Sequence, residues 1–162
     1  MQSKRSRVTV KFMVEKLSVT HAAHWVRDTL ELEGLEQDFP RFAGACAISS
    51  YILWLVLRAE GHAAVLVCVV DHKGTGEGHC WVEVDGLVVD ITATQFDGKK
   101  VCIFPIGTPS PHHRGRHLYE LTGENRFEND EAIREVSDWD VQSPFSWDSL
   151  IESVISENSV AV

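Results

Sequence analysis

The sequence has few basic residues, no long apolar run and no closely spaced pair of cysteines. Its 162 residues include 15 Lys and Arg against 24 Asp and Glu, which gives a formal net charge of −9. Nothing concentrates positive charge over a long stretch, so nucleic acid is not expected as a partner. The most apolar stretch, Ala45–Leu57, is too short to span a bilayer and contains Ser49 and Ser50. Membrane insertion and nucleic-acid binding are therefore not indicated.

The start of the sequence shows no secretory signal peptide. The first seven residues are basic, but residues 8–17 contain no uninterrupted apolar run and no small-residue cleavage site. We therefore expect a soluble, cytoplasmic protein. Hydrophobic residues make up 44% of the chain and no internal repeat is visible, so one domain is expected over residues 1–162. Its core is expected at 39–104, with a loop and helical extension at 105–162.

The four cysteines form no C-x-x-C pair, which argues against a structural zinc site. We expect neither a metal nor another cofactor. Cys68, Cys80 and Cys102 each lie inside a strand-like run, where a free cysteine commonly acts as a small buried hydrophobe. Cys46 instead stands at the start of a helical pattern, and this setting distinguishes it from the other three.

Two helices are predicted in the first part of the chain. Ser18–Glu33 places its apolar residues near helical spacing. Cys46–Glu60 is apolar nearly all round, which is typical of a central helix that is covered on several sides. Gly61 supplies the left-handed position that commonly closes a helix. The residues between the two helices, 35–45, are predicted to form a loop.

Strands are predicted after the second helix. Ala63–Val70 is a continuous run rich in β-branched residues, which indicates a buried strand. His79–Val84 and Leu87–Thr92 are joined by Asp85-Gly86, a strong hairpin signal. Helices followed by an antiparallel meander indicate an α+β fold. The sequence further predicts a strand at Val101–Phe104, a loop at Ile106–His117 and a terminal helix at Ser146–Ser156.

The predicted hairpin places a histidine and an aspartate on one face. If Asp85-Gly86 is a two-residue turn, Trp81 faces Asp90, and His79 becomes a diagonal neighbour of Asp90. An imidazole and a carboxylate at that separation could hydrogen-bond, which would fix the free ring nitrogen. The alternative is an ordinary hairpin with one dry and one wet face, and the hairpin alone favours that alternative.

Cys46 is the candidate nucleophile. A helix N-terminus presents unpaired N–H groups and a partial positive charge, both of which favour a thiolate. The same N–H groups can bind the oxyanion that forms when a thiolate attacks a carbonyl. Together with a histidine, this cysteine has the parts for acyl transfer through a thioester. For an isolated cysteine, a buried structural role is the better interpretation.

Two short motifs are interpreted as loops. GTGEG at residues 74–78 lacks the Gly-Lys-Ser/Thr ending of a phosphate loop and leads into a strand, which favours a flexible connection. HHRGRH at residues 112–117 carries histidines at a spacing that can bind a metal. It has no helical or strand frame to fix their geometry, so an exposed loop is favoured.

The combined pattern resembles the transglutaminase-like branch of the papain-like cysteine protease superfamily. In that family a helix led by cysteine is followed by strands bearing His and then Asp, often as H-x-W-x-E-V-x-G with a hydrophobic run ending in Asp. Residues 39–96 carry the resemblance, and the matching residues in order are Cys46, His79, Trp81, Glu83, Val84, Gly86 and Asp90. The resemblance implies an α+β fold with a papain-like or transglutaminase-like core, in which the central helix led by the cysteine packs on an antiparallel sheet.

The resemblance also implies roles for individual residues. Cys46 would be the nucleophile, His79 the general base and then acid, and Asp90 the residue that orients the histidine. Trp81 would be a structural neighbour of this triad. A side-chain oxyanion donor, commonly a glutamine upstream of the cysteine, is not clearly placed, and Gln37 and Gln95 are the candidates.

The expected function is thiol-dependent acyl transfer on an amide of a protein, a peptide or a small molecule. Peptide or isopeptide hydrolysis, glutamine deamidation and transfer to an amine all begin with the same thioester. Hydrolysis is favoured because water needs no second binding site. One alternative is a non-catalytic binding module on the same fold. Another is a small zinc hydrolase built on His79, Cys80 and residues 112–117. The sequence does not predict the oligomeric state.

Overall fold

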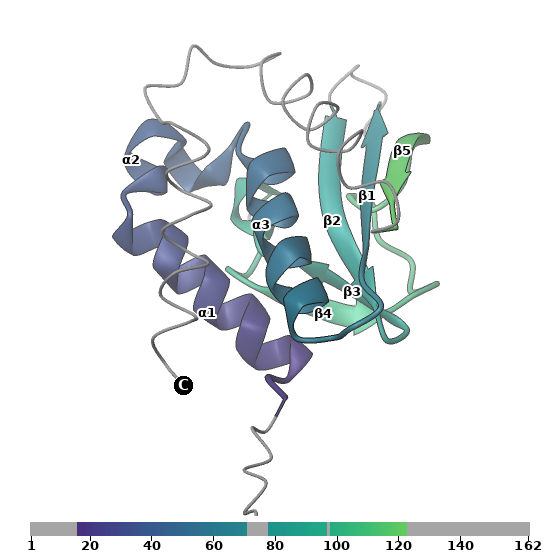
Figure 1. Cartoon of the computed structure of the whole chain (residues 1–162). Coiled ribbons are helices and arrows are strands. Elements are labelled where there is room, and N and C mark those ends of the chain that lie inside the picture. Colours follow the sequence, from purple (N-terminus) through teal and green to yellow (C-terminus); the bar gives the residue numbers. More distant parts are fainter. Residues whose placement is uncertain (1–15, 71–77, 97, 123–162) are drawn as a thin grey trace, which may run out of the picture.

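The computed structural model describes residues 16–70, 78–96 and 98–122, and it shows helices packed on one face of a five-stranded antiparallel sheet (Figure 1). The strands lie in the order β4-β3-β2-β1-β5. The helices are α1 (Val19–Leu32), α2 (Leu35–Asp38) and α3 (Cys46–Ala59), and the strands are β1 (Val65–Val70), β2 (Gly78–Val84), β3 (Leu87–Asp90), β4 (Cys102–Pro105) and β5 (Arg116–Leu121). None of the helices in the described ranges has the length and hydrophobicity needed to traverse a bilayer.

Helix α3 lies in the centre of the fold, between α1 and the sheet (Figure 1). Its residues from Cys46 to Leu57 are all buried, as the nearly continuous apolar pattern predicts. The hydroxyl of Ser50 donates to the carbonyl of Cys80 on β2 at 3.0 Å, which ties the helix to the sheet. The helix ends at Ala59, and Gly61, which follows the cap residue Glu60, has a φ of 80°, the left-handed conformation expected there.

The predicted β2–β3 hairpin is confirmed. Asp85 and Gly86 have φ values of 51° and 80°, the two positive values that a two-residue type I′ turn requires. Val84 pairs with Leu87 and Val82 with Val89, so the predicted register is correct. The strand face that includes Val82 and Val89 belongs to the main core, together with residues of α1 and α3.

The opposite face of the hairpin is not a wet face. Trp81 and Val88 are 3% and 5% exposed and pack with Val67 and Val69 in a second, smaller hydrophobic cluster. The chain after β4 returns across this face, and the His113 ring packs edge-on against the Trp81 ring at 5.2 Å. Polar groups on this face are therefore held in a largely dry environment, where they require partners.

The cysteines differ from the prediction in two respects. Cys68 and Cys80 are buried as expected, but they are direct partners in the β1–β2 register and form a disulfide. The sequence analysis missed this pair because it depends on which residues of separate strands face each other. Cys102 is only partly buried, and both it and Cys46 are free thiols.

Other expectations are corrected at the element boundaries. The segment 35–45 contains α2 and a 3₁₀ turn at Pro40–Phe42 rather than only a loop. The loop expected at 106–117 ends earlier, because β5 begins at Arg116 and pairs with β1. Nothing local marked β5 as a strand; its pairing with the edge of β1 defines it. The predicted terminal helix at 146–156 lies outside the described residues.

A charged cluster joins α1 to the segment before β4. Glu31 accepts hydrogen bonds from Arg27 Nε at 2.9 Å and from Lys100 Nζ at 2.6 Å. Partial burial alone would raise the pKa of Glu31, but Lys100 and Arg27 outweigh it and hold that pKa below its usual value. A carboxylate with a lowered pKa stabilises the fold above its unfolded pKa and loses this effect as the pH falls.

We therefore expect Glu31→Gln to lower the free energy of unfolding by about 0.5–1 kcal/mol near neutral pH. The difference between the two proteins should shrink as the pH falls below the usual carboxyl pKa, about 4.5. Urea unfolding at a series of pH values measures this difference. Glu36→Gln, at an exposed position on α2, is the matched control. A difference that persists unchanged at acid pH would contradict the ionic explanation.

Candidate active site

Cys46 is the first residue of α3 and is 9% exposed. The turn before it is built from unusual backbone conformations, since Arg41 and Phe42 have φ values of 59° and 61° and Gly44 has 83°. For the two non-glycine residues these conformations are costly and persist only where surrounding contacts enforce them. Phe42 is buried, and the guanidinium of Arg27 lies 3.5 Å from its ring centre. The position of the thiol at the start of the helix is therefore fixed by packing.

His79 on β2 connects the thiol to the hairpin aspartate. Its side chain is fully buried, and its Nε2 donates to Asp90 Oδ2 at 2.9 Å. The Cys46 side chain lies beside the same imidazole and contributes to raising its pKa. Nε2 of this ring is held by Asp90, and Nδ1 has the side-chain amide of Gln95 3.4 Å away. The three residues predicted to form a triad are therefore brought together in one chain of contacts.

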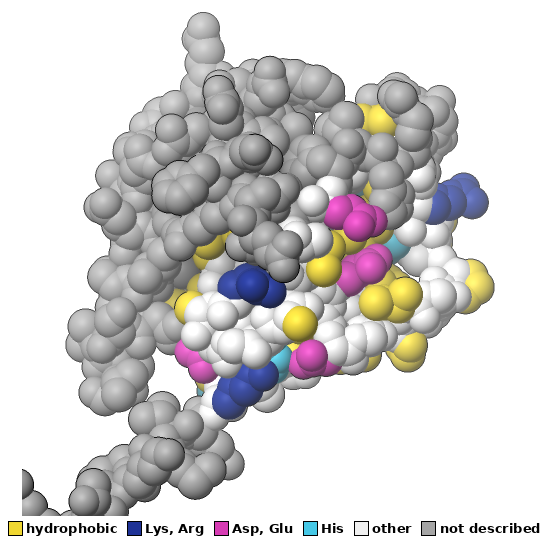
Figure 2. All heavy atoms as spheres, turned by 45° about the vertical axis from the view of Figure 1, so that its right-hand side comes forward, with side chains coloured by type: hydrophobic (Ala, Val, Ile, Leu, Met, Phe, Trp, Pro, Cys, Tyr) yellow, Lys and Arg dark blue, Asp and Glu magenta, His cyan; other side chains and the backbone are white. Residues whose placement is uncertain are grey.

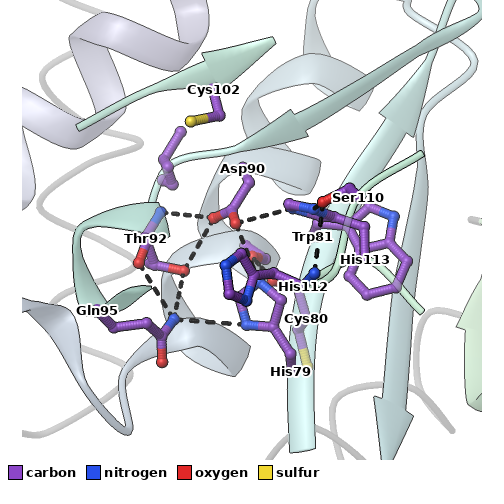
Figure 3. A network of polar contacts seen from close by, with 12 residues as sticks. His79, Cys80, Trp81, Asp90, Thr92, Gln95, Cys102, Ser110, His112 and His113 are labelled. Carbon is purple, nitrogen blue, oxygen red and sulfur yellow. Dashed lines mark hydrogen bonds and ion pairs between the residues drawn. The ribbon is translucent and has the colours of Figure 1, made fainter. Parts of the chain in front are cut away.

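Asp90, at the end of β3, is fully buried and accepts four hydrogen bonds (Figure 3). Its Oδ1 accepts from the backbone N–H of Thr92 at 2.7 Å and from the Thr92 hydroxyl at 3.0 Å. Its Oδ2 accepts from His79 and, at 3.0 Å, from Nε2 of His113. A buried carboxylate needs such a set of donors to remain ionised.

The ionisation of the pair follows from these contacts. Burial lowers the pKa of His79, but Asp90 and Cys46 beside it outweigh burial and raise that pKa to about 10. Burial likewise raises the pKa of Asp90, while His79 and His113 together bring it far below its usual range. At neutral pH the site therefore holds a carboxylate beside a charged imidazolium.

Two arginines hold the segment after Asp90 in place. Arg27, almost fully buried, donates to the carbonyl of Ile91 at 2.6 Å. Arg41 donates to the carbonyl of Thr94 at 2.7 Å and 3.1 Å, and the Thr94 hydroxyl donates back to the Arg41 carbonyl at 3.1 Å. The turn that precedes Cys46 is thereby bound to the turn that follows Asp90, although the two lie far apart in sequence.

A family model described as "Transglutaminase-like superfamily" matches residues 5–97, more than half of the chain. The chain belongs to the transglutaminase-like superfamily. The match extends from the N-terminal region through Cys46, His79 and Asp90, and it agrees with the resemblance seen in the sequence. No curated protein and no solved structure matches this transglutaminase-like chain significantly.

Of the two glutamines considered as oxyanion donors, the transglutaminase-like fold brings only Gln95 to the histidine. Gln95 Nε2 lies 3.4 Å from His79 Nδ1 and donates to the carbonyl of Thr92 at 3.1 Å (Figure 3). Gln37 is exposed on α2, with its side chain folded toward Gly34. Trp81 is buried beside the site, with its ring centre 5.8 Å from that of His79.

His113 is the site residue that sequence reasoning missed. The sequence predicts an exposed loop at HHRGRH, yet the His113 side chain is only 7% exposed and reaches Asp90. Its neighbour His112 stacks on the Phe96 ring, with ring centres 4.3 Å apart. The closely spaced histidines are the one signal in the sequence that points to this residue. The sequence does not show that the loop crosses the sheet beside Asp90.

A pocket of about 560 Å³ opens beside His113, on the face of the sheet away from α3. Apolar walls come from Trp81, Phe104 and Ile106, while Glu83 and Arg114 add opposite charges. In Figure 2, which brings the β5 side of the molecule forward, acidic and hydrophobic side chains lie next to each other and the Lys and Arg side chains are scattered. The pocket thus borders the site through His113, while His79 and Asp90 themselves are fully buried.

We expect Arg27→Met to lower the free energy of unfolding by about 2–4 kcal/mol, because the buried Ile91 carbonyl would lose its donor. Urea unfolding monitored by tryptophan fluorescence measures the change. Arg58→Met, at an exposed position near the end of α3, is the matched control and should change stability by less than about 0.5 kcal/mol. Equal effects of the two substitutions would show that Arg27 does not anchor the site.

Proposed function

We propose that this transglutaminase-like protein is a cysteine enzyme that transfers the acyl group of an amide through a thioester, with water as the preferred acceptor. The observation that carries the proposal is the chain of contacts from Cys46 to His79 to Asp90 at the N-terminus of a buried helix. A structural cysteine needs neither a buried histidine nor an aspartate with a full set of donors. The proposed core is papain-like, and the substrate is a protein, a peptide or a small amide.

In the proposed reaction, Cys46 Sγ attacks the amide carbonyl carbon and its proton is held by His79. The resulting oxyanion is stabilised by N–H groups at the start of α3. The C–N bond then breaks, and His79 gives its proton to the leaving nitrogen, which leaves a thioester on Cys46. Water attacks the thioester with His79 as base, which releases the acid and restores the thiol. An amine in place of water would give transfer instead.

Asp90 has an orienting role in this scheme. Its Oδ2 holds Nε2 of His79, so that Nδ1 is directed to the thiol and the imidazolium is stabilised. Gln95 is proposed as the side-chain oxyanion donor, because its amide lies next to Nδ1 of the same ring. The non-catalytic alternative, a binding module on the same fold, predicts no special reactivity at Cys46.

The proposed nucleophile should react with iodoacetamide much faster than Cys102, the other free thiol. At about pH 6, where ordinary thiols are protonated, we expect rapid labelling of Cys46 and a roughly 10- to 100-fold decrease in His79→Ala. Peptide mass mapping locates the adduct. Cys102→Ala is the matched control and should keep the fast reaction. Slow labelling of Cys46, or equal labelling of both thiols, would contradict a catalytic role.

The roles of the two glutamines can be separated with a protein substrate whose amines are blocked, such as dimethylated casein. New amino groups report peptide hydrolysis, ammonia released in the absence of an added amine reports deamidation, and incorporation of a fluorescent primary amine reports transfer. We expect Gln95→Ala to lower the rate by about 100-fold, the typical loss for one oxyanion donor, and Gln37→Ala to leave it unchanged. The opposite pattern would assign the donor role to Gln37.

A further inference from the structure

Asp90 contacts a second imidazole that the proposed acyl transfer does not use. His113 and His79 both direct Nε2 at Asp90 Oδ2, at 3.0 Å and 2.9 Å (Figure 3). The three atoms that could bind a metal, one from each side chain, all lie within 4.8 Å of one another. Two imidazole nitrogens and one carboxylate oxygen are a ligand set that zinc adopts in proteins with an open coordination position.

The two separations from Asp90 Oδ2 fit a zinc ion after a small movement. Zinc binds nitrogen and oxygen at about 2.0–2.2 Å, so neighbouring ligand atoms of a tetrahedral site lie about 3.3–3.5 Å apart. The two known separations from Asp90 Oδ2 are 2.9 Å and 3.0 Å, and each would have to open by only a few tenths of an ångström. The ion would displace the protons that Nε2 of His79 and Nε2 of His113 donate to Asp90. The His79 proton would leave to solvent, and the His113 proton would move to Nδ1, which faces the hydroxyl of Ser110.

The outer contacts of the three side chains match those of a metal site. The remaining oxygen of Asp90 is held by Thr92, and His113 Nδ1 lies 2.7 Å from the hydroxyl of Ser110. Metal-ligating histidines usually bond through their second nitrogen in this manner, which fixes the ring orientation. These contacts leave the Nε2 atoms of His79 and His113 as the nitrogens that face Asp90.

An ion could reach this position without passing the thiol. His113 and Ser110 line the pocket of about 560 Å³ on the face of the sheet away from α3. The pocket has room for water molecules, which could fill the fourth coordination position. The imidazole ligands select a transition metal of the zinc type over Mg²⁺ or Ca²⁺, which prefer sites built wholly from oxygen.

We propose that His79, Asp90 and His113 form a zinc-binding site whose occupation reversibly inhibits the thiol reaction. Zinc on Nε2 would separate His79 from Asp90 and make the imidazole a poorer base toward Cys46. The inhibitory effect rests on the proposed function, whereas the binding site does not. This role is regulatory, and zinc supplies no chemistry to the acyl transfer.

Binding is tested on metal-free Cys46→Ala protein by isothermal titration with ZnCl₂. This variant excludes zinc held directly by the thiol. We expect one ion per chain, and a loss of affinity of about 100-fold or more in the double variant Cys46→Ala/His113→Phe, which loses one ligand. Phe keeps an aromatic ring between Trp81 and Phe104, and circular dichroism checks the fold. Cys46→Ala/His24→Ala removes an exposed histidine of α1 and should bind zinc unchanged.

Inhibition is tested by the rate at which iodoacetamide labels Cys46, measured within each variant with and without zinc. We expect zinc to slow labelling of the wild-type protein, EDTA to restore it, and His113→Phe to require at least about 10-fold more zinc. Absence of zinc binding by Cys46→Ala, or equal zinc sensitivity of wild type and His113→Phe, overturns the inference. If labelling is slow without zinc but the ion binds through His113, the metal site stands and the proposed acyl transfer fails.

Discussion

The site depends on one buried carboxylate. Asp90 is fully enclosed, and an isolated charge in such a place would be prohibitively costly. Four donors from three segments offset that cost: His79 from the neighbouring strand, Thr92 from the following turn and His113 from the chain after β4. The need to satisfy this carboxylate draws these segments together and orients the imidazole that contacts Cys46. Removal of any donor would leave an incompletely solvated charge in a dry environment.

A second set of contacts fixes the position of the Cys46 thiol relative to the Asp90 carboxylate. Cys46 belongs to a helix and Asp90 to a sheet, so their relative position depends on how the two layers are joined. Arg27 reaches from α1 to the carbonyl of Ile91, and Arg41 and Thr94 exchange hydrogen bonds between the two turns. The positive φ values at Arg41 and Phe42 are backbone strain that this packing supports.

The two imidazoles on Asp90 give the site more than one possible state. With a proton between His79 and Asp90, the arrangement suits a thiol nucleophile and its base. With a metal ion between these side chains, His79, Asp90 and His113 would form a three-ligand coordination site with one open position, and the thiol would lose its partner. Substitution of His113 separates the two states experimentally. His113 supplies the third metal ligand, but it contacts Asp90 and has no role in the proposed thiol reaction.

Sequence alone predicted the features that neighbouring residues decide. Asp85-Gly86 dictates a two-residue turn, the turn sets the register, and the register places His79 and Asp90 on one face. The apolar pattern that begins at Cys46 likewise determines a buried helix with a cysteine at its start. The family match covers these same residues.

The tertiary structure decided what depends on residues far apart in the chain. His113 lies 23 positions from Asp90, and its approach depends on where the chain after β4 crosses the sheet. The pairing of Cys68 with Cys80, the position of Gln95 beside His79, and the burial of the second hairpin face have the same origin. Turn chemistry and periodicity act over a few residues, whereas these contacts exist only after separate segments have packed together.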